Sequence, residues 1–343
     1  MKPLLNTLYV TTQGAWLAQE GETVAVRVEQ ETRLRVPIHT LTGIACFGHV
    51  GCSPFLMALC AERGVSLSFL TEHGRFLARV QGPVSGNVLL RRKQYRVTDD
   101  PVGAAGIARA VVLAKIANCR NILQRAARER VESRETAALD GAILRLKRII
   151  EDTTDCSSID TIRGHEGDGA RTYFGVFDHL ILANKEEFFF RARSRRPPLD
   201  NINALLSFLY TLLTHDMTGA LETVGLDPAV GFLHRERPGR PSLALDLVEE
   251  LRPVLADRLA LALVNRREIS AHGFHRLETG GVTMDGDTRK EVLVAWQKRK
   301  YEEIVHPYLN EKLPLGLVPY VQATLLARHL RGDIDGYPCF FSK

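Results

Sequence analysis

Residues 91–101, Arg-Arg-Lys-Gln-Tyr-Arg-Val-Thr-Asp-Asp-Pro, separate two parts of the chain whose apolar residues recur with different periods. Before this stretch, the valines of residues 24–28 occupy every second position, which is the period of a β-strand. After it, Ile107, Val111 and Ala114 recur at the spacing of one helical face. The stretch itself is polar and basic and ends in turn-forming residues. It therefore predicts a boundary between a strand-rich part and a helical part.

The part before the boundary is predicted to be a small β domain. Short apolar runs at 43–47 and 65–70 are typical of buried strands. One helix is predicted between them, because Ser53 is a favourable N-cap and Pro54 fits the first helical position. We expect residues 1–92 to form a β-sandwich-like domain with this one helix.

The part after the boundary is predicted to be helical, because strand patterns are sparse there. Pro197 and Pro198 cannot lie inside a helix. Asp200 follows them and is placed to cap a helix over 201–213. The predicted fold class is therefore α+β, with a large all-helical domain over residues 93–343.

Length and composition exclude several classes of protein. The 343 residues suggest two domains, and the 45% hydrophobic and 25% charged fractions are typical of a folded globular chain. No uncharged apolar run of roughly 18 residues occurs, so we expect no transmembrane helix. The N-terminus lacks the apolar core of a signal peptide, and we expect a cytoplasmic protein. The six cysteines form no Cys-x-x-Cys pair and are expected to be reduced and mostly buried.

The positive charge of the chain is clustered. The net charge is only +5, but four arginines and no acid lie in residues 191–196. Residues 109–148 carry ten basic and four acidic side chains, and residues 289–300 carry five and one. Such clusters suit a polyanion spread over a wide surface. The alternative is that these side chains only solvate helix faces.

Residues 231–253, Gly-Phe-Leu-His-Arg-Glu-Arg-Pro-Gly-Arg-Pro-Ser-Leu-Ala-Leu-Asp-Leu-Val-Glu-Glu-Leu-Arg-Pro, are the strongest candidate for a site. Ser242 is a plausible N-cap for a helix on which Asp246 and Glu249 share one face. Carboxylates among apolar residues are costly to bury unless a metal ion or a proton compensates. The loop before the helix can fold His234 towards that face. Alternatively, the helix macrodipole stabilises the acids and His234 is an ordinary loop histidine.

A second candidate lies at residues 164–174, Gly-His-Glu-Gly-Asp-Gly-Ala-Arg-Thr-Tyr-Phe. Its three glycines would allow a close backbone approach where a helix begins, with Glu166 among them. An ordinary loop and helix start would give the same pattern.

Together the two segments resemble a known family. The motifs are Glu-Gly-x-x-Ala-Arg-x-Tyr-Phe, Arg-Arg-Pro-Pro-x-Asp-x-x-Asn, and Gly-Phe-Leu-His with Ser-Leu-Ala-Leu-Asp-Leu-x-Glu-x-x-Arg-Pro. Their order and spacing, and a β domain before a helical one, resemble the CRISPR-associated protein one family. The resemblance covers essentially the whole chain. The ending at residues 337–341 and the length are most similar to the type I-C branch.

The resemblance implies an integrase that inserts spacers into CRISPR arrays. It places the metal ligands at Glu166, His234 and Glu249, the last where many relatives carry aspartate, and a supporting acid at Asp246. The implied cofactor is Mg²⁺ or Mn²⁺. The 3′-hydroxyl of a prespacer strand would attack a phosphodiester at the repeat boundary, which the metal ion polarises. His234 would act either as a ligand or in proton transfer.

Basic residues near these positions are candidates for DNA contacts. Most such residues neutralise phosphates and read no bases, and any single one can instead be a solvated surface charge. The candidates are Arg163, Arg171, Arg191, Arg193, Arg195, Arg196, Arg235, Arg237, Arg240 and Arg252.

The resemblance also implies partners. These are double-stranded DNA, a second copy of the chain joined through the β domain, and a dimer of CRISPR-associated protein two that bridges two such homodimers into a heterohexamer. Two other functions share the same residues or fold: a stand-alone metal-dependent nuclease for branched DNA in repair, and a non-catalytic DNA-binding scaffold.

Overall fold

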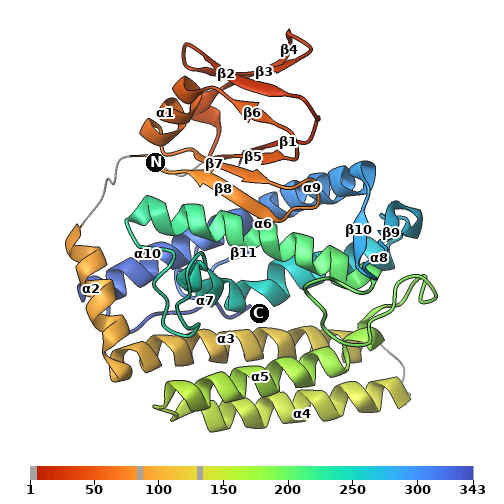
Figure 1. Ribbon diagram of the computed structural model, residues 1–343. Coiled ribbons are helices and arrows are strands. Elements are labelled where there is room, and N and C mark those ends of the chain that lie inside the picture. Colours follow the sequence, from red (N-terminus) through yellow and green to blue (C-terminus); the bar gives the residue numbers. More distant parts are fainter. Residues whose placement is uncertain (1–5, 83–87, 130–133, 343) are drawn as a thin grey trace.

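The computed structural model describes residues 6–82, 88–129 and 134–342. A β domain lies above a larger helical domain (Figure 1), in the chain order expected. The α+β class is confirmed.

The β domain contains two four-stranded sheets and one helix. One sheet has the order β1-β5-β7-β8, in which only the β7–β8 pair is antiparallel. The other has the order β4-β3-β2-β6, in which only β2 and β6 are parallel. The strands are β1 (Thr7–Val10), β2 (Trp16–Glu20), β3 (Thr23–Val28), β4 (Glu31–Pro37), β5 (Gly43–Phe47), β6 (Gly51–Cys52), β7 (Ser66–Leu70) and β8 (Phe76–Val80).

Strand β5 is buried on both faces, which explains its continuous apolar run. Ile44 and Cys46 point into a core shared by both sheets and helix α1 (Pro54–Glu62). Ala45 and Phe47 point the other way, into the core of the helical domain. The sheet is therefore the layer that joins the two domains.

Helix α1 begins as predicted. Ser53 is its N-cap, with the hydroxyl oxygen accepting from the backbone N–H of Leu56 at 3.2 Å, and Pro54 is its first residue. All six cysteines are free, and five of them are buried, as expected.

The helical domain is built around α3 (Pro101–Arg128), against which α4, α5 and α7 pack. By length and composition α3 could cross a membrane, but 61% of its most apolar stretch is buried inside the protein. It is the core helix of this domain. The others are α2 (Val88–Asp99), α4 (Arg134–Thr154), α5 (Ile159–Gly175), α6 (Asn201–Val224), α7 (Ser242–Leu251), α8 (Arg258–Asn265), α9 (Gly286–Tyr301) and α10 (Val318–Arg331).

Two details differ from the sequence-based expectation. The domain is not all-helical, because β9 (Phe274–Arg276) pairs with β10 (Val282–Met284) and β11 (Glu303–Val305) pairs with β12 (Lys312–Pro314). Strands of three residues are too short to show a period of two in the sequence.

The second difference concerns the boundary at 92/93. It falls inside α2, which runs to Asp99. Asp100 then caps α3 through its carboxylate, so the turn chemistry marks a junction between two helices.

Candidate active site

Asp246 on α7 holds the segment that carries His234. Its carboxylate accepts backbone N–H groups of Phe232 at 2.6 Å, Leu233 at 2.9 Å and His234 at 2.8 Å. It also lies 2.7 Å from Nδ1 of the His234 ring. Gly231 permits this wrapping, because a Cβ there would lie 2.7 Å from a carboxylate oxygen of Asp246.

Further contacts fix the same segment. Arg163 on α5 donates from Nε to the carbonyl of Leu233 at 2.6 Å. Ser242 donates from its hydroxyl to the carbonyl of Arg235 at 3.3 Å.

The predicted N-cap of α7 is wrong by one residue. Ser242 is the first residue of α7, and the N-cap position is held by Pro241.

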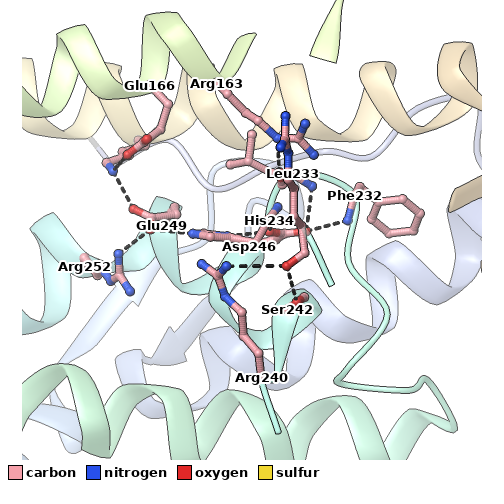
Figure 2. A network of polar contacts seen from close by, with 12 residues as sticks. Arg163, Glu166, Phe232, Leu233, His234, Arg240, Ser242, Asp246, Glu249 and Arg252 are labelled. Atoms are coloured by element: carbon pink, nitrogen blue, oxygen red, sulfur yellow. Dashed lines mark hydrogen bonds and ion pairs between the residues drawn. The ribbon is translucent and has the colours of Figure 1, made fainter. Parts of the chain in front are cut away.

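Glu249 lies one turn along α7 on the same face as Asp246 and is only 2% exposed. Nε2 of His234 is 3.8 Å from its Oε1. Figure 2 shows Glu166 on α5 lying across from Glu249, with His234 between Asp246 and Glu249. The structure therefore brings together Glu166, His234 and Glu249, which are separated in the sequence, and places Asp246 behind His234.

A residue that the sequence analysis missed lies between the two glutamates. Lys115 on α3 is 7% exposed, and its ammonium pairs with Glu166 and lies 2.6 Å from Oε2 of Glu249. The signal that could have revealed it is a lysine flanked by Ala114 and Ile116 on the apolar face of α3. A buried lysine requires a carboxylate partner.

The charges around Glu249 decide its ionisation. Burial by itself raises the pKa of this carboxyl, but the positive charges of Arg252 and Lys115 outweigh it and hold the pKa well below its usual range. For Lys115, burial opposes the charged form, and Glu249 and Glu166 nevertheless raise its pKa. Glu249 and Lys115 therefore form an ion pair at neutral pH.

The donor set fits a divalent cation. Two carboxylates and an imidazole suit Mn²⁺ and also occur with Mg²⁺. Among the described residues, Oε2 of Glu249 receives no hydrogen bond of acceptable geometry, although the Lys115 ammonium is near. Within the same ranges no three acidic, cysteine or histidine side chains already converge as a metal cluster. The residue types at this site are therefore suitable for binding a divalent cation. In this structure the Lys115 ammonium lies between the two carboxylates.

The glycine-rich segment is not a loop. Residues 164–169 lie within α5, and a Cβ on Gly169 would meet Ile116 of α3 at 3.0 Å. A Cβ on Gly164 or Gly167 would meet no atom within 4 Å. Close helix packing at Gly169, rather than a backbone approach to a ligand, explains one of the three glycines.

Three of the predicted DNA-contacting arginines are held by partly or fully buried contacts within the protein. Arg252 pairs with Glu249 and lies 4.8 Å above the Tyr210 ring. Arg193 is over the same ring and donates to Asn203 at 2.7 Å. Arg163 holds the 231–234 segment, as described above. The sequence cannot distinguish these arginines from surface arginines. Arginine is equally suited to an ion pair, to stacking on an aromatic ring and to hydrogen bonding with a carbonyl.

The remaining candidates are more accessible. Arg171, Arg191, Arg195, Arg196, Arg235 and Arg237 are exposed, and Arg240 is half-buried. Burial lowers the pKa of Arg240, and the charges of Arg237, Arg195 and Arg196 lower it further. The charges of Arg195 and Arg196, in segment 191–196, therefore act on Arg240 in segment 235–240.

Comparison with known proteins identifies the family of this chain. The family model described as CRISPR associated protein Cas1 matches residues 8–298. The chain is 53% identical to the CRISPR-associated endonuclease Cas1 1 of Chlorobaculum tepidum over 340 residues, which is 99% of both chains. It is also 53% identical to the CRISPR-associated endonuclease Cas1 2 of Rhodospirillum rubrum, over 100% of both.

Solved structures share the fold. A Cas1 protein from Thermotoga maritima superposes with a TM-score of 0.82 at 23% identity, covering 98% of this chain and 100% of that one. A casposase bound to an integration product gives 0.80 at 21%, covering 97% and 93%. The fold and the relatives' common activity define an endonuclease-type enzyme. The chain belongs to the CRISPR-associated protein Cas1 family.

Proposed function

We propose that this enzyme inserts prespacer DNA into a CRISPR array by attack of a 3′-hydroxyl on a phosphodiester at the repeat boundary. The proposal is supported above all by one observation. Glu166 on α5, His234 in the loop before α7 and Glu249 on α7 lie close together. Support also comes from the casposase, whose solved complex holds an integration product. We further propose the type I-C branch, on the length and the 337–341 ending, and a cytoplasmic location.

In this proposal Glu166, Glu249 and His234 would hold a Mg²⁺ or Mn²⁺ ion. When bound, the ion would polarise the scissile phosphate and stabilise the charge that develops on it. Asp246 accepts the Nδ1 proton of His234, which leaves the Nε2 lone pair for the ion or for a proton from the attacking hydroxyl. Arg252 keeps Glu249 ionised and in place.

The proposed DNA contacts come from the exposed arginines of segments 191–196 and 235–240 and from Arg171. They would neutralise backbone phosphates next to the reacting one. The proposed assembly is a homodimer through the β domain, with two homodimers bridged by a dimer of CRISPR-associated protein two. In a Cas6-RT-Cas1–Cas2 complex, 36% of one chain matches the fold of 98% of this chain, with a TM-score of 0.84 at 20% identity.

Strand transfer tests the proposal. The protein, its small partner, labelled prespacer DNA and a supercoiled plasmid with a CRISPR repeat would be incubated with Mg²⁺ or Mn²⁺. We expect joined product at the repeat boundary from wild type and from His275→Ala, a half-exposed control histidine on β9. His234→Ala or chelator should abolish it. Cleavage of branched DNA without joining would favour a repair nuclease, and binding without either reaction would favour a scaffold.

A further inference from the structure

We propose that Lys115 is a built-in counter-ion, which holds Glu166 and Glu249 together in the metal-free enzyme and which a divalent ion must displace. Lys115 would then set how tightly the ion binds. This inference rests on the proposed metal site and adds a residue that controls it.

The position of the Lys115 ammonium supports this role. Lys115 extends from α3 and contacts carboxylates on two other helices, Glu166 on α5 and Glu249 on α7. Those two carboxylates are the acidic members of the proposed ligand set. A cation that bridges them lies in the region that a bound metal ion would share.

The charges of this buried site are balanced without a metal ion. Glu249 is 2% exposed and Lys115 is 7% exposed, so neither charge is well solvated. Lys115 and Arg252 together balance Glu166 and Glu249. Removing one partner of a buried pair leaves an uncompensated charge, which is strongly unfavourable. In the metal-free enzyme, the buried charges of the site are therefore neutralised by one another.

A divalent ion would add positive charge to the site and compete with the Lys115 ammonium. Two further positive charges beside a buried ammonium repel it, and the repulsion is large where water is excluded. The ion also needs the carboxylate oxygens that Lys115 contacts. Lysine is a flexible point charge on a four-carbon stem, so its ammonium can move while α3 stays in place. Arg252 differs, because its guanidinium is fixed between Glu249 and the Tyr210 ring.

The test compares full-length wild type with Lys115→Met, Lys115→Arg and Lys300→Met. Lys300 is the matched control, since it is also buried, at 3% exposure, and pairs with Asp216 at 3.0 Å outside the site. Mn²⁺ binding is measured by calorimetry without DNA, and the Tm is measured without metal.

We expect Lys115→Met to bind Mn²⁺ about ten-fold more tightly or better, because one repelling charge is gone. Its metal-free Tm should fall, and Mn²⁺ should restore much of the loss. Lys115→Arg keeps the charge but replaces the flexible ammonium by a planar guanidinium, and should bind Mn²⁺ no more tightly than wild type does. Lys300→Met should lose Tm without any change in Mn²⁺ affinity. Unchanged or weaker binding by folded Lys115→Met would overturn the inference.

A measurement on the wild-type protein covers the case in which Lys115→Met does not fold. Amine-reactive ester labelling followed by mass spectrometry reports access to each lysine. Labelling of Lys115 should rise on addition of Mn²⁺, while labelling of Lys300 should not change. Equal labelling with and without Mn²⁺ would show that the ammonium is not displaced.

The two proposals fail in different ways. If wild type binds no Mn²⁺ that His234→Ala removes, the proposed metal site is wrong. If wild type binds such an ion but Lys115→Met binds it no more tightly, only the role of Lys115 is wrong.

Discussion

Nδ1 of His234 lies 2.7 Å from Oδ1 of Asp246, and the same carboxylate accepts three consecutive backbone N–H groups, including that of His234 itself. One buried side chain thus sets both the backbone path and the ring orientation of the histidine. Asp246 is 1% exposed and is far better enclosed than His234. We therefore propose that Asp246 acts as a positioning residue, which is the supporting role predicted for it from the sequence.

Asp246→Asn should lower stability and activity together. The amide replaces one acceptor oxygen by a donor that faces backbone N–H groups, which costs about 1–3 kcal/mol of unfolding free energy. Strand transfer should fall about 10- to 100-fold, as is typical when the partner of a ligand histidine is removed. Urea unfolding and strand-transfer rates measure the two effects. Ser242→Ala, which loses only one 3.3 Å contact, is the control. Wild-type activity of Asp246→Asn would contradict the positioning role.

Arg252 and Arg237 should behave in opposite ways. Arg252→Met removes a cation from buried Glu249 and should cost about 3–5 kcal/mol of unfolding free energy, with little change in DNA affinity measured without metal. Arg237→Ala should leave stability within about 0.5 kcal/mol of wild type. Its DNA affinity should fall, and the log–log salt slope should decrease by about one. A stable Arg252→Met with weak DNA binding would show that the two assignments are reversed.

Asp257 should make stability depend on pH. Burial raises its pKa to about 6 from the ordinary 3.8, against hydrogen bonds from Tyr210 at 2.6 Å and Tyr173 at 3.2 Å. Between pH 3.8 and about 6, Asp257 is therefore protonated in the folded state and ionised in the unfolded state. Stability from this group is complete below pH 3.8 and is lost as pH rises through about 6.

The loss amounts to about 3 kcal/mol, since one pKa unit corresponds to about 1.4 kcal/mol. Unfolding free energies of wild type and Asp257→Asn, measured at intervals across this pH range, isolate the contribution. The variant should show a flatter pH profile. Identical profiles would mean that Asp257 ionises in the folded protein as it does in the unfolded chain.

Gly74 should be required where the β7–β8 turn meets the helical domain. Its φ is +81°, and a Cβ there would lie 2.6 Å from the ring of Phe208 on α6. Gly74→Ala combines backbone strain with a clash and should cost about 2 kcal/mol or more of unfolding free energy. Gly14→Ala is the matched control, since φ is +75° and no atom lies within 4 Å of its Cβ. The control should lose about 1 kcal/mol; equal losses would exclude the contact with Phe208.

Periodicity and local chemistry were enough to predict much of the fold. The Ser53–Pro54 start of α1 and the Asp200 cap of α6 depend only on neighbouring residues, and both are confirmed. The short strands β9–β12 could not be predicted, because three residues are too few to show the period of a strand and each is stabilised by pairing within its hairpin. The glycines of α5 were misread for a similar reason. Gly169 lies against Ile116 on another helix, where a Cβ would have little room, and this contact cannot be seen in the local sequence.

The sequence by itself determined which acids and which histidine are candidates for chemistry, because residue type and spacing carry that information. Only the tertiary structure decided what lies between them. Lys115 and Glu166 are 51 positions apart and meet because α3 and α5 pack together. Folding also separated the arginines into those that hold the site and those that face solvent. Both outcomes depend on distance and burial, which arise only when the helices are packed.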